Sequence, residues 1–162
     1  MSAASAHWPA WHEATALELL APLLSLPGPL LPALHAVQAH FGFIPPEATA
    51  LLATTFNLSR AEVHGVLTFY DFFRREPPGQ RIVRLCQAEA CQAMGSEALA
   101  AHAKAQLGVD FHQTTADGRV SLEPVYCLGN CACAPAMMID ERLHGRVSAA
   151  RFDALVLAGE SA

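Results

Sequence analysis

A short segment rich in proline and glycine, REPPGQR at residues 75–81, separates two parts of this chain that have different hydrophobic patterns. Proline and glycine interrupt helices and strands, so such a segment is typical of a linker. Before it, apolar residues recur at helical spacing, whereas after it short strand-like runs alternate with helical stretches. A chain of 162 residues, 52% of them hydrophobic, can form one domain or two small ones. We therefore predict a helical domain over residues 1–76 and an α/β domain over residues 77–162.

The first part carries signals for several helices. Apolar residues on one helical face predict a helix over residues 30–41, and Pro46 is placed to begin a second. Ser59 can cap a third helix, with Glu62 as the reciprocal partner of a capping box. These signals together predict a helical bundle.

The compartment and the partner class follow from charge and from the N-terminal residues. The apolar run over residues 14–35 is interrupted by Glu18 and by prolines and a glycine between residues 27 and 32, which favours two buried helices over a membrane span. Residues 1–14 contain no Lys or Arg, so they lack the features of an export or transit signal. The net charge is -5 without a basic run, which argues against nucleic acid as a partner. We expect a cytoplasmic protein that does not insert into a membrane.

The second part alternates strand and helix signals. Ser96 is expected to cap a helix and Gly108 to end it. The expected elements are, in order, a strand over residues 81–86, a helix over residues 96–107, strand-like runs on either side of Asp117 and Gly118, a hairpin over residues 136–147, and a helix from Ser148. This order predicts a small α/β sandwich.

Four of the five cysteines fall into two pairs, and each pair follows a predicted strand. Cys86 and Cys91 have four residues between them, Cys127 and Cys131 have three, and 35 residues separate the pairs. Loops that follow strands ending at the same edge of a sheet lie close together, so four thiolates can converge on one site. The pattern indicates a metal or cluster site.

Several occupants of this site remain open. Zinc uses the same four thiolates, although tighter spacing within each pair is more usual. A thioredoxin-type redox pair needs two residues between its cysteines, which neither pair has, and disulfides suit an oxidising compartment. A 2Fe-2S cluster accepts wider loops and needs backbone amides directed at its sulfurs, which Gly95 and Gly129 allow. The spacing favours the cluster over zinc.

Other candidate residues have structural interpretations. Cys133 is expected to be a small residue beside the site, because four thiolates already complete a ligand set. Phe69, Phe72 and Phe73, in the run TFYDFF, are expected to seal the helical part onto its neighbour domain. No pair of carboxylates suggests a general acid or base, so we predict no catalytic residue.

The longer motifs resemble a known family. CQAEACQAMGSEAL and LEPVYCLGNCACAPAMMID, preceded by VQAHFGFIPPEA and LSRAEVHGVLTFYDFF, are similar to the thioredoxin-like 2Fe-2S ferredoxins over about residues 16–157. That family includes the small iron–sulfur subunit of respiratory complex I and matching subunits of NAD-dependent hydrogenases and formate dehydrogenases. The resemblance implies an N-terminal helical bundle, a thioredoxin-like α/β domain, and one 2Fe-2S cluster held by Cys86, Cys91, Cys127 and Cys131.

Within this family, the alanine-rich CQAEACQAMGSEALAAHA and the NCACAP run look most like the gamma subunit of molybdenum-containing, NAD-dependent formate dehydrogenases. This narrower resemblance implies a non-catalytic electron-transfer subunit that docks beside an FMN- and NAD-binding subunit, together with a large molybdenum and iron–sulfur subunit. FMN, NAD and the molybdenum cofactor are then expected only in the partner subunits. The equivalent subunit of complex I or of an NAD-reducing hydrogenase is the alternative, and a structural zinc module is the alternative without redox chemistry.

Overall fold

The computed structural model describes residues 8–158. The chain divides into two compact units, one that ends at Pro78 and one that begins at Gly79. Each unit has its own hydrophobic core.

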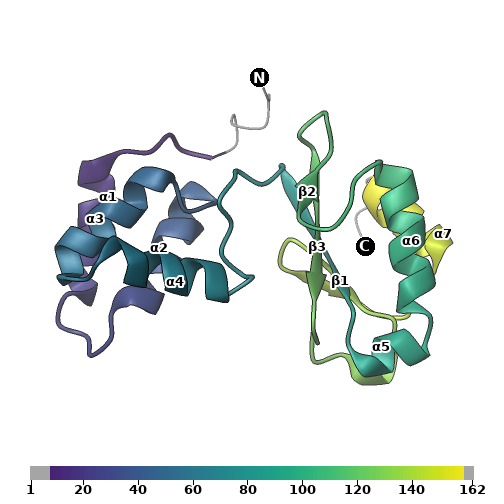
Figure 1. Ribbon diagram of the computed structural model, residues 1–162. Helices are drawn as coiled ribbons and strands as arrows, with labels where there is room; N and C mark the ends of the chain where they lie inside the picture. Colours follow the sequence, from purple (N-terminus) through teal and green to yellow (C-terminus); the bar gives the residue numbers. More distant parts are fainter. Residues whose placement is uncertain (1–7, 159–162) are drawn as a thin grey trace. The chain divides into compact units, whose positions relative to one another are not determined.

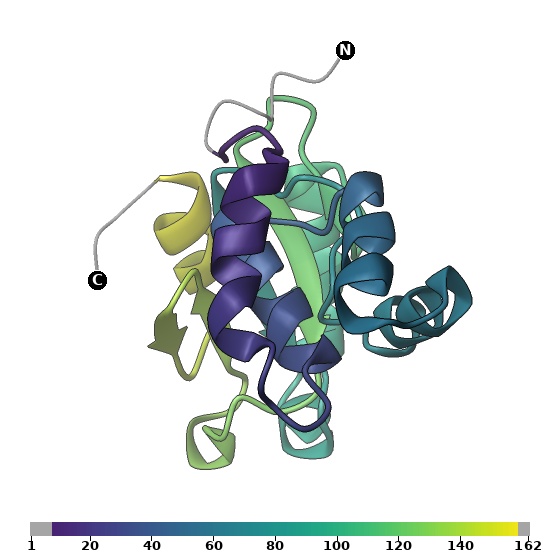
Figure 2. The same cartoon turned by 90° about the vertical axis from the view of Figure 1, so that its left-hand side faces the viewer.

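Helices make up the first unit (Figure 1; Figure 2). They are α1 (Glu13–Leu20), α2 (Leu30–Phe41), α3 (Pro46–Phe56) and α4 (Arg60–Phe69), with a short 3-10 turn at Ala21–Leu23. All four contribute buried residues to one core, including Leu20, Leu34, Leu52 and Val63. The predicted helical pattern is therefore confirmed, and the apolar run over residues 14–35 forms two helices joined by a turn. None of the helices within residues 8–158 is long and apolar enough to cross a membrane.

The start of α4 has the predicted capping box. The Glu62 amide donates to Ser59 Oγ at 3.2 Å, and the Ser59 amide donates to Glu62 Oε2 at 2.7 Å. These reciprocal bonds satisfy amides that the first helical turn leaves without partners. The hydrogen bonds to Ser59 also hold the pKa of the Glu62 carboxyl below its usual range.

The aromatic run that begins at the end of α4 is only partly buried. Phe73 lies in the core of the helical unit, whereas Phe69 is 78% exposed and Phe72 is 52% exposed. The buried side chain of Gln38 fixes this segment to α2, because its amide donates to the Phe72 carbonyl at 2.9 Å and accepts from the Arg74 amide at 2.7 Å. A seal against the neighbouring domain stays a prediction for Phe69 and Phe72.

The second unit is built on a mixed sheet with the strand order β2-β3-β1-β4-β5. Strands β1 and β3 are parallel, and the other neighbours are antiparallel. The strands are β1 (Arg81–Cys86), β2 (Gln113–Thr114), β3 (Val120–Val125), β4 (Met137–Ile139) and β5 (Arg142–His144). The helices of this unit are α5 (Glu89–Ala93), α6 (Ser96–Leu107) and α7 (Ala149–Phe152). A π-helical turn at Asp153–Leu157 follows α7. This architecture confirms the predicted α/β, thioredoxin-like class.

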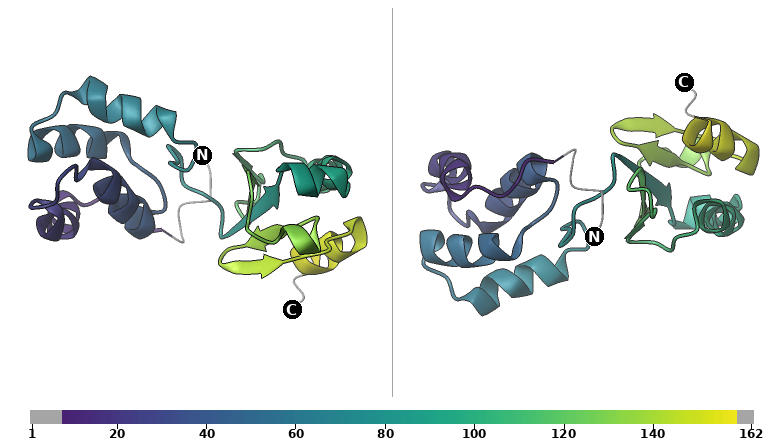
Figure 3. Two further views of the ribbon diagram at one scale, coloured as in Figure 1. Left: turned by 90° about the horizontal axis from the view of Figure 1, so that it is seen from below. Right: turned by 90° about the horizontal axis from the view of Figure 1, so that it is seen from above.

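Helices α6 and α7 lie on one face of the sheet (Figure 1; Figure 3). Val83, Leu122 and Met137 point to this face and are fully buried with Leu99 and Phe152 in one core. Residues at alternating positions, such as Arg84 and Glu123, are only partly buried, as expected for a sheet whose strands send side chains to opposite faces.

One local prediction, the cap of the helix that begins near residue 96, was wrong. The cap of α6 is Gly95, with a φ of 92° that favours glycine, and not Ser96. Ser96 is instead the first helical residue, and its buried hydroxyl has no hydrogen-bond partner among residues 8–158. On β4, Met138 is half-buried on the face opposite α6, while its neighbour Met137 is fully buried.

Candidate metal centre

The two cysteine pairs follow neighbouring parallel strands. Cys86 is the last residue of β1 and lies opposite Val125, the last residue of β3. Cys127 comes two residues after the end of β3. Because parallel strands end at the same edge of a sheet, the loops that follow β1 and β3 lie side by side. The expected convergence of the two loops is confirmed.

Cys86 and Cys91 form the buried pair, each 2% exposed. The Cys86 amide donates to the Ala136 carbonyl at 3.0 Å, which joins the end of β1 to the segment before β4. Cys91 lies in α5, a helix of five residues whose first turn is closed by a bond from the Cys91 amide to the Ala88 carbonyl at 2.9 Å. Both thiols pack with Ala134 and Ala136 in a small cluster of their own. Packing therefore fixes the positions of these two sulfurs.

Cys127 and Cys131 form the exposed pair, with their Sγ atoms 3.7 Å apart. Cys127 has a φ of 107°, a conformation rarely adopted by residues other than glycine. Gly129, with a φ of 73°, directs its amide at Cys127 Sγ at 3.3 Å. Cys131 begins a 3-10 turn that runs to Cys133. Backbone conformation, and not burial, positions these sulfurs.

The pKa shifts link the two pairs electrostatically. Burial acts to raise the pKa of the Cys86 thiol, but hydrogen bonds from the Ala88 backbone, from Cys91 and from the backbones of Cys127 and Leu128 outweigh it, so that the pKa is lowered. Those bonds from the second loop stabilise a thiolate at the end of the first.

The pKa values of two neighbouring thiols, Cys91 and Cys131, shift in the opposite direction. Burial, followed by the hydrogen bond with Cys86, raises the pKa of the Cys91 thiol, which also feels the charge of Cys131. The hydrogen bond with Cys127 raises the pKa of Cys131, and the charges of Cys127 and Cys86 add to this effect. Negative charge on one thiolate raises the pKa of the thiols beside it. A cation would stabilise such a group of thiolates.

Cys133 has a different environment. It is half-buried, its amide donates to the Asn130 carbonyl at 3.0 Å, and its carbonyl accepts from the Arg146 amide at 2.6 Å. The structure thus uses the backbone of Cys133 to join the second loop to the segment after β5.

The donor set fits an iron–sulfur cluster. All five cysteines are free of disulfides, and four thiolates with backbone amides aimed at sulfur match the ligation of a 2Fe-2S centre, which divides its ligands between two irons. Within residues 8–158, no group of three or more His, Cys, Asp or Glu side chains is placed to hold a metal ion.

The sequence did not reveal the backbone donors of the site. The amides of Ala88, Leu128 and Gly129 point at cysteine sulfurs, but every residue other than proline has an amide, so residue type carries little information about it. Of the two glycines named from the sequence, Gly129 directs its amide at a sulfur, whereas the Gly95 amide donates to the Gln92 carbonyl at 2.9 Å.

Comparisons with known proteins agree with this geometry. An NADH-quinone oxidoreductase subunit from Pseudomonas aeruginosa is 43% identical over 115 residues, which cover 71% of this chain and 69% of the relative. The NADP-reducing hydrogenase subunit HndA of Solidesulfovibrio fructosivorans is 36% identical over 121 residues, covering 75% of this chain and 71% of the relative.

Among solved structures, the crystal structure of an NAD+-reducing NiFe-hydrogenase in the air-oxidised state matches with a TM-score of 0.66 and 33% identity. The match covers 79% of this chain and only 22% of the hydrogenase chain. Members of the family described as thioredoxin-like 2Fe-2S ferredoxin bind one 2Fe-2S cluster, and the model of that family matches residues 19–159. With a match over most of its length and four thiols at adjacent strand ends, this chain belongs to the thioredoxin-like 2Fe-2S ferredoxin family.

Proposed function

We propose that this chain is the 2Fe-2S electron-transfer subunit of an NAD-linked oxidoreductase complex. Cys86, Cys91, Cys127 and Cys131 hold the cluster in a domain that spans residues 77–162. The observation that carries the proposal is the meeting of a buried and an exposed cysteine pair at the ends of two parallel strands, with backbone amides directed at their sulfurs. The subunits of NAD- and NADP-linked complexes to which the chain is similar support the assignment.

The chain's residues hold and tune the site and convert no substrate. A bound 2Fe-2S cluster supplies one-electron transfer. Cys86 and Cys91 anchor it against the core, and the amides of Ala88, Leu128 and Gly129 stabilise negative charge on the sulfurs. Tuning by such hydrogen bonds sets how readily the site accepts an electron.

The parent complex that we propose is a cytoplasmic, molybdenum-containing, NAD-dependent formate dehydrogenase, with this chain as its gamma subunit. The support is the likeness of CQAEACQAMGSEALAAHA and NCACAP to that subunit. Its partners are then an FMN- and NAD-binding subunit and a large molybdenum and iron–sulfur subunit. The relatives from NADH-quinone oxidoreductase and from hydrogenase favour the equivalent subunit of those complexes as the second candidate.

Metal analysis tests the cofactor. The chain, purified without oxygen, is expected to be red-brown, to contain iron and acid-labile sulfide in equal amounts, and to give an electron paramagnetic resonance signal on reduction. Colourless protein with stoichiometric zinc would instead identify a structural zinc module and refute electron transfer.

Isolation of the native complex tests the parent enzyme. A tag on this chain, expressed in its own host, should retain a molybdenum subunit and formate-dependent reduction of NAD. A nickel subunit with hydrogen-dependent reduction of NAD would assign the chain to a hydrogenase, and a set of membrane subunits would assign it to NADH:quinone oxidoreductase.

A further inference from the structure

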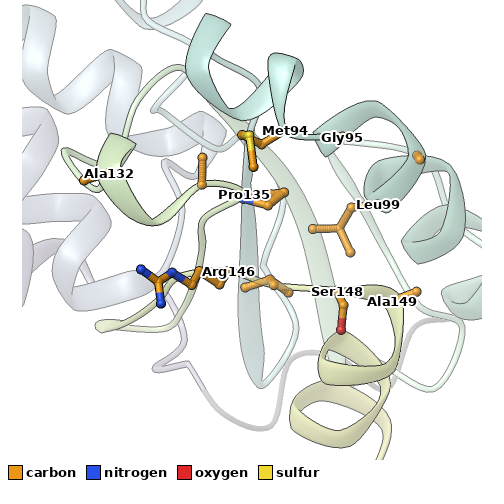
Figure 4. A pocket seen from close by; sticks show the side chains of 11 residues that line it. Met94, Gly95, Leu99, Ala132, Pro135, Arg146, Ser148 and Ala149 are labelled. Carbon is orange, nitrogen blue, oxygen red and sulfur yellow. The ribbon is translucent and has the colours of Figure 1, made fainter.

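An apolar groove lies beside the cysteine loops, lined by residues from the segments 94–99, 132–135 and 146–149, with a volume of about 640 Å³ (Figure 4). Its floor is apolar and buried, since Leu99 is 5% exposed, Ala134 is 8% exposed and Val147 is 2% exposed. All three segments belong to the unit that begins at Gly79.

Two of these segments are continuous with the proposed ligand loops. Met94 lies three residues after Cys91, and Ala132 directly follows Cys131. The third segment is tied to the second by the bond from the Arg146 amide to the Cys133 carbonyl at 2.6 Å. A molecule seated in the groove therefore lies against both loops that carry the cysteines.

The groove is open, which suits a segment of another protein. Met94 at its rim is 62% exposed, and Ala98, Ala132 and Ala149 are also exposed. Sites for small molecules usually enclose most of the ligand surface in a concave pocket. A shallow apolar groove with small side chains along its rim instead fits a side chain presented by a partner's backbone.

Arg146 gives the groove its charge. Arg146 is the only charged residue among the described residues that line the groove, and the structure gives its exposed guanidinium no ion pair or hydrogen bond within residues 8–158. Arg146 and Leu99 lie toward opposite ends of the groove (Figure 4). A complementary ligand therefore combines an apolar group with a carboxylate.

We propose that the groove docks a segment of the partner redox subunit that inserts an apolar side chain over Leu99 and Val147 and pairs a carboxylate with Arg146. The proposal rests on the proposed function, since it takes the partner to be the subunit that exchanges electrons with this chain. Docking here holds that partner against the loops of Cys91 and Cys131, where a short electron-transfer path is required.

Charge reversal at Arg146 is the first test. In a competition experiment, the cluster-loaded Arg146→Glu variant should displace labelled wild-type chain from the isolated native complex. It should need a concentration about tenfold or more above that of unlabelled wild type, because an attractive ion pair becomes repulsive. Arg142→Glu makes the same charge change at an exposed position on β5 outside the groove and should compete like wild type. Equal competition by both variants would overturn the proposal.

Filling the groove is the second test. Ala98→Trp places a large side chain in the groove and should weaken competition about as much as Arg146→Glu, whereas Ala105→Trp, at an exposed position two turns further along α6, should not. Iron content and the paramagnetic signal are measured on each variant. The docking proposal is refuted if Ala98→Trp keeps its cluster and competes as well as wild type. The proposed function is refuted if the wild-type chain carries no iron.

Crosslinking identifies the occupant. A photoreactive p-benzoylphenylalanine at position 98, in the native complex, should join to a partner peptide that contains Asp or Glu, and replacing that residue by Arg should restore competition to Arg146→Glu. A crosslink to a second copy of this chain, to residues 8–78 of the chain itself, or to a peptide without an acidic residue would overturn the proposal.

Discussion

The two cysteine pairs differ in how the protein positions them. Cys86 and Cys91 are each 2% exposed and pack with Ala134 and Ala136. Cys127 and Cys131 are exposed and depend on a left-handed backbone at Cys127 and on the amide of Gly129. One half of the site thus belongs to the core, and the other half is a surface loop whose shape is set by its own backbone.

The buried pair and the exposed pair therefore have different properties within one site, a fixed geometry in the first and accessibility in the second. Buried thiols gain a fixed geometry from close packing, which resists small displacements. The exposed pair remains open to solvent, and under our proposal it is also accessible to an incoming cluster and to a docking protein. The comparison therefore predicts that equivalent changes in the two pairs have unequal effects.

Serine substitution should give the largest contrast. Cys86→Ser or Cys91→Ser should abolish cluster binding, because a buried hydroxyl without a partner costs about 1–3 kcal/mol in addition to the lost thiolate. Cys127→Ser or Cys131→Ser should retain a smaller amount of cluster with a shifted spectrum, since an exposed serine stays solvated. Iron content and visible absorption measure both outcomes.

Cys133→Ser is the control for these variants and should keep the wild-type iron content, because four other thiolates form the proposed ligand set. Loss of the cluster in this variant would place Cys133 among the ligands. If serine substitution caused the same loss of cluster in both pairs, the buried pair and the exposed pair would not differ in how they hold the cluster.

Thiol alkylation should show a smaller contrast in protein from which the cluster has been removed. Iodoacetamide should modify Cys127 and Cys131 at least about tenfold faster than Cys91, because reactivity requires access as well as a thiolate. Burial both shields Cys91 and raises the pKa of its thiol. Mass spectrometry of the digested protein gives each rate, and equally fast modification of Cys91 would show that its packing depends on the cluster.

Glycine replacement should have the smallest effect. Gly129→Ala places a side chain at a φ of 73°, where no atom lies within 4 Å of the added Cβ, so the cost is backbone strain of about 1–2 kcal/mol. Because this strain acts on the exposed loop, the cluster should be lost faster in air, as followed by absorbance.

Gly108→Ala is the matched control, with a φ of 67° and equally open space at the end of α6. It should lower the melting temperature without changing the lifetime of the cluster. Equal lifetimes in both variants would show that the loop does not depend on the conformation of Gly129.

Much of the fold could be predicted because its signals are local. The capping box of Ser59 and Glu62, the strand that ends at Cys86 and the turn at Asp117 and Gly118 depend on neighbours in sequence. The meeting of the cysteine pairs was predictable from two strand-like runs, because parallel strands bring their ends to one edge.

The remaining features depend on tertiary contacts. Spacing could not show that Phe73 is buried while Phe69 is exposed, because both lie in one aromatic run. Gly95 and Ser96 are both acceptable caps, and the choice was decided by the short helix α5, which places Gly95 in a left-handed conformation. The backbone at Cys127 is likewise set by the loop as a whole and not by the residue type.

The parallel pairing of β1 with β3 also constrains biogenesis. During synthesis Cys86 and Cys91 leave the ribosome long before Cys127 and Cys131, and the pairs become neighbours only when β3 has aligned along β1. For the proposed ligands, all four sulfurs can therefore reach one cluster only once β3 has paired with β1, and the two earlier thiols must stay reduced until then.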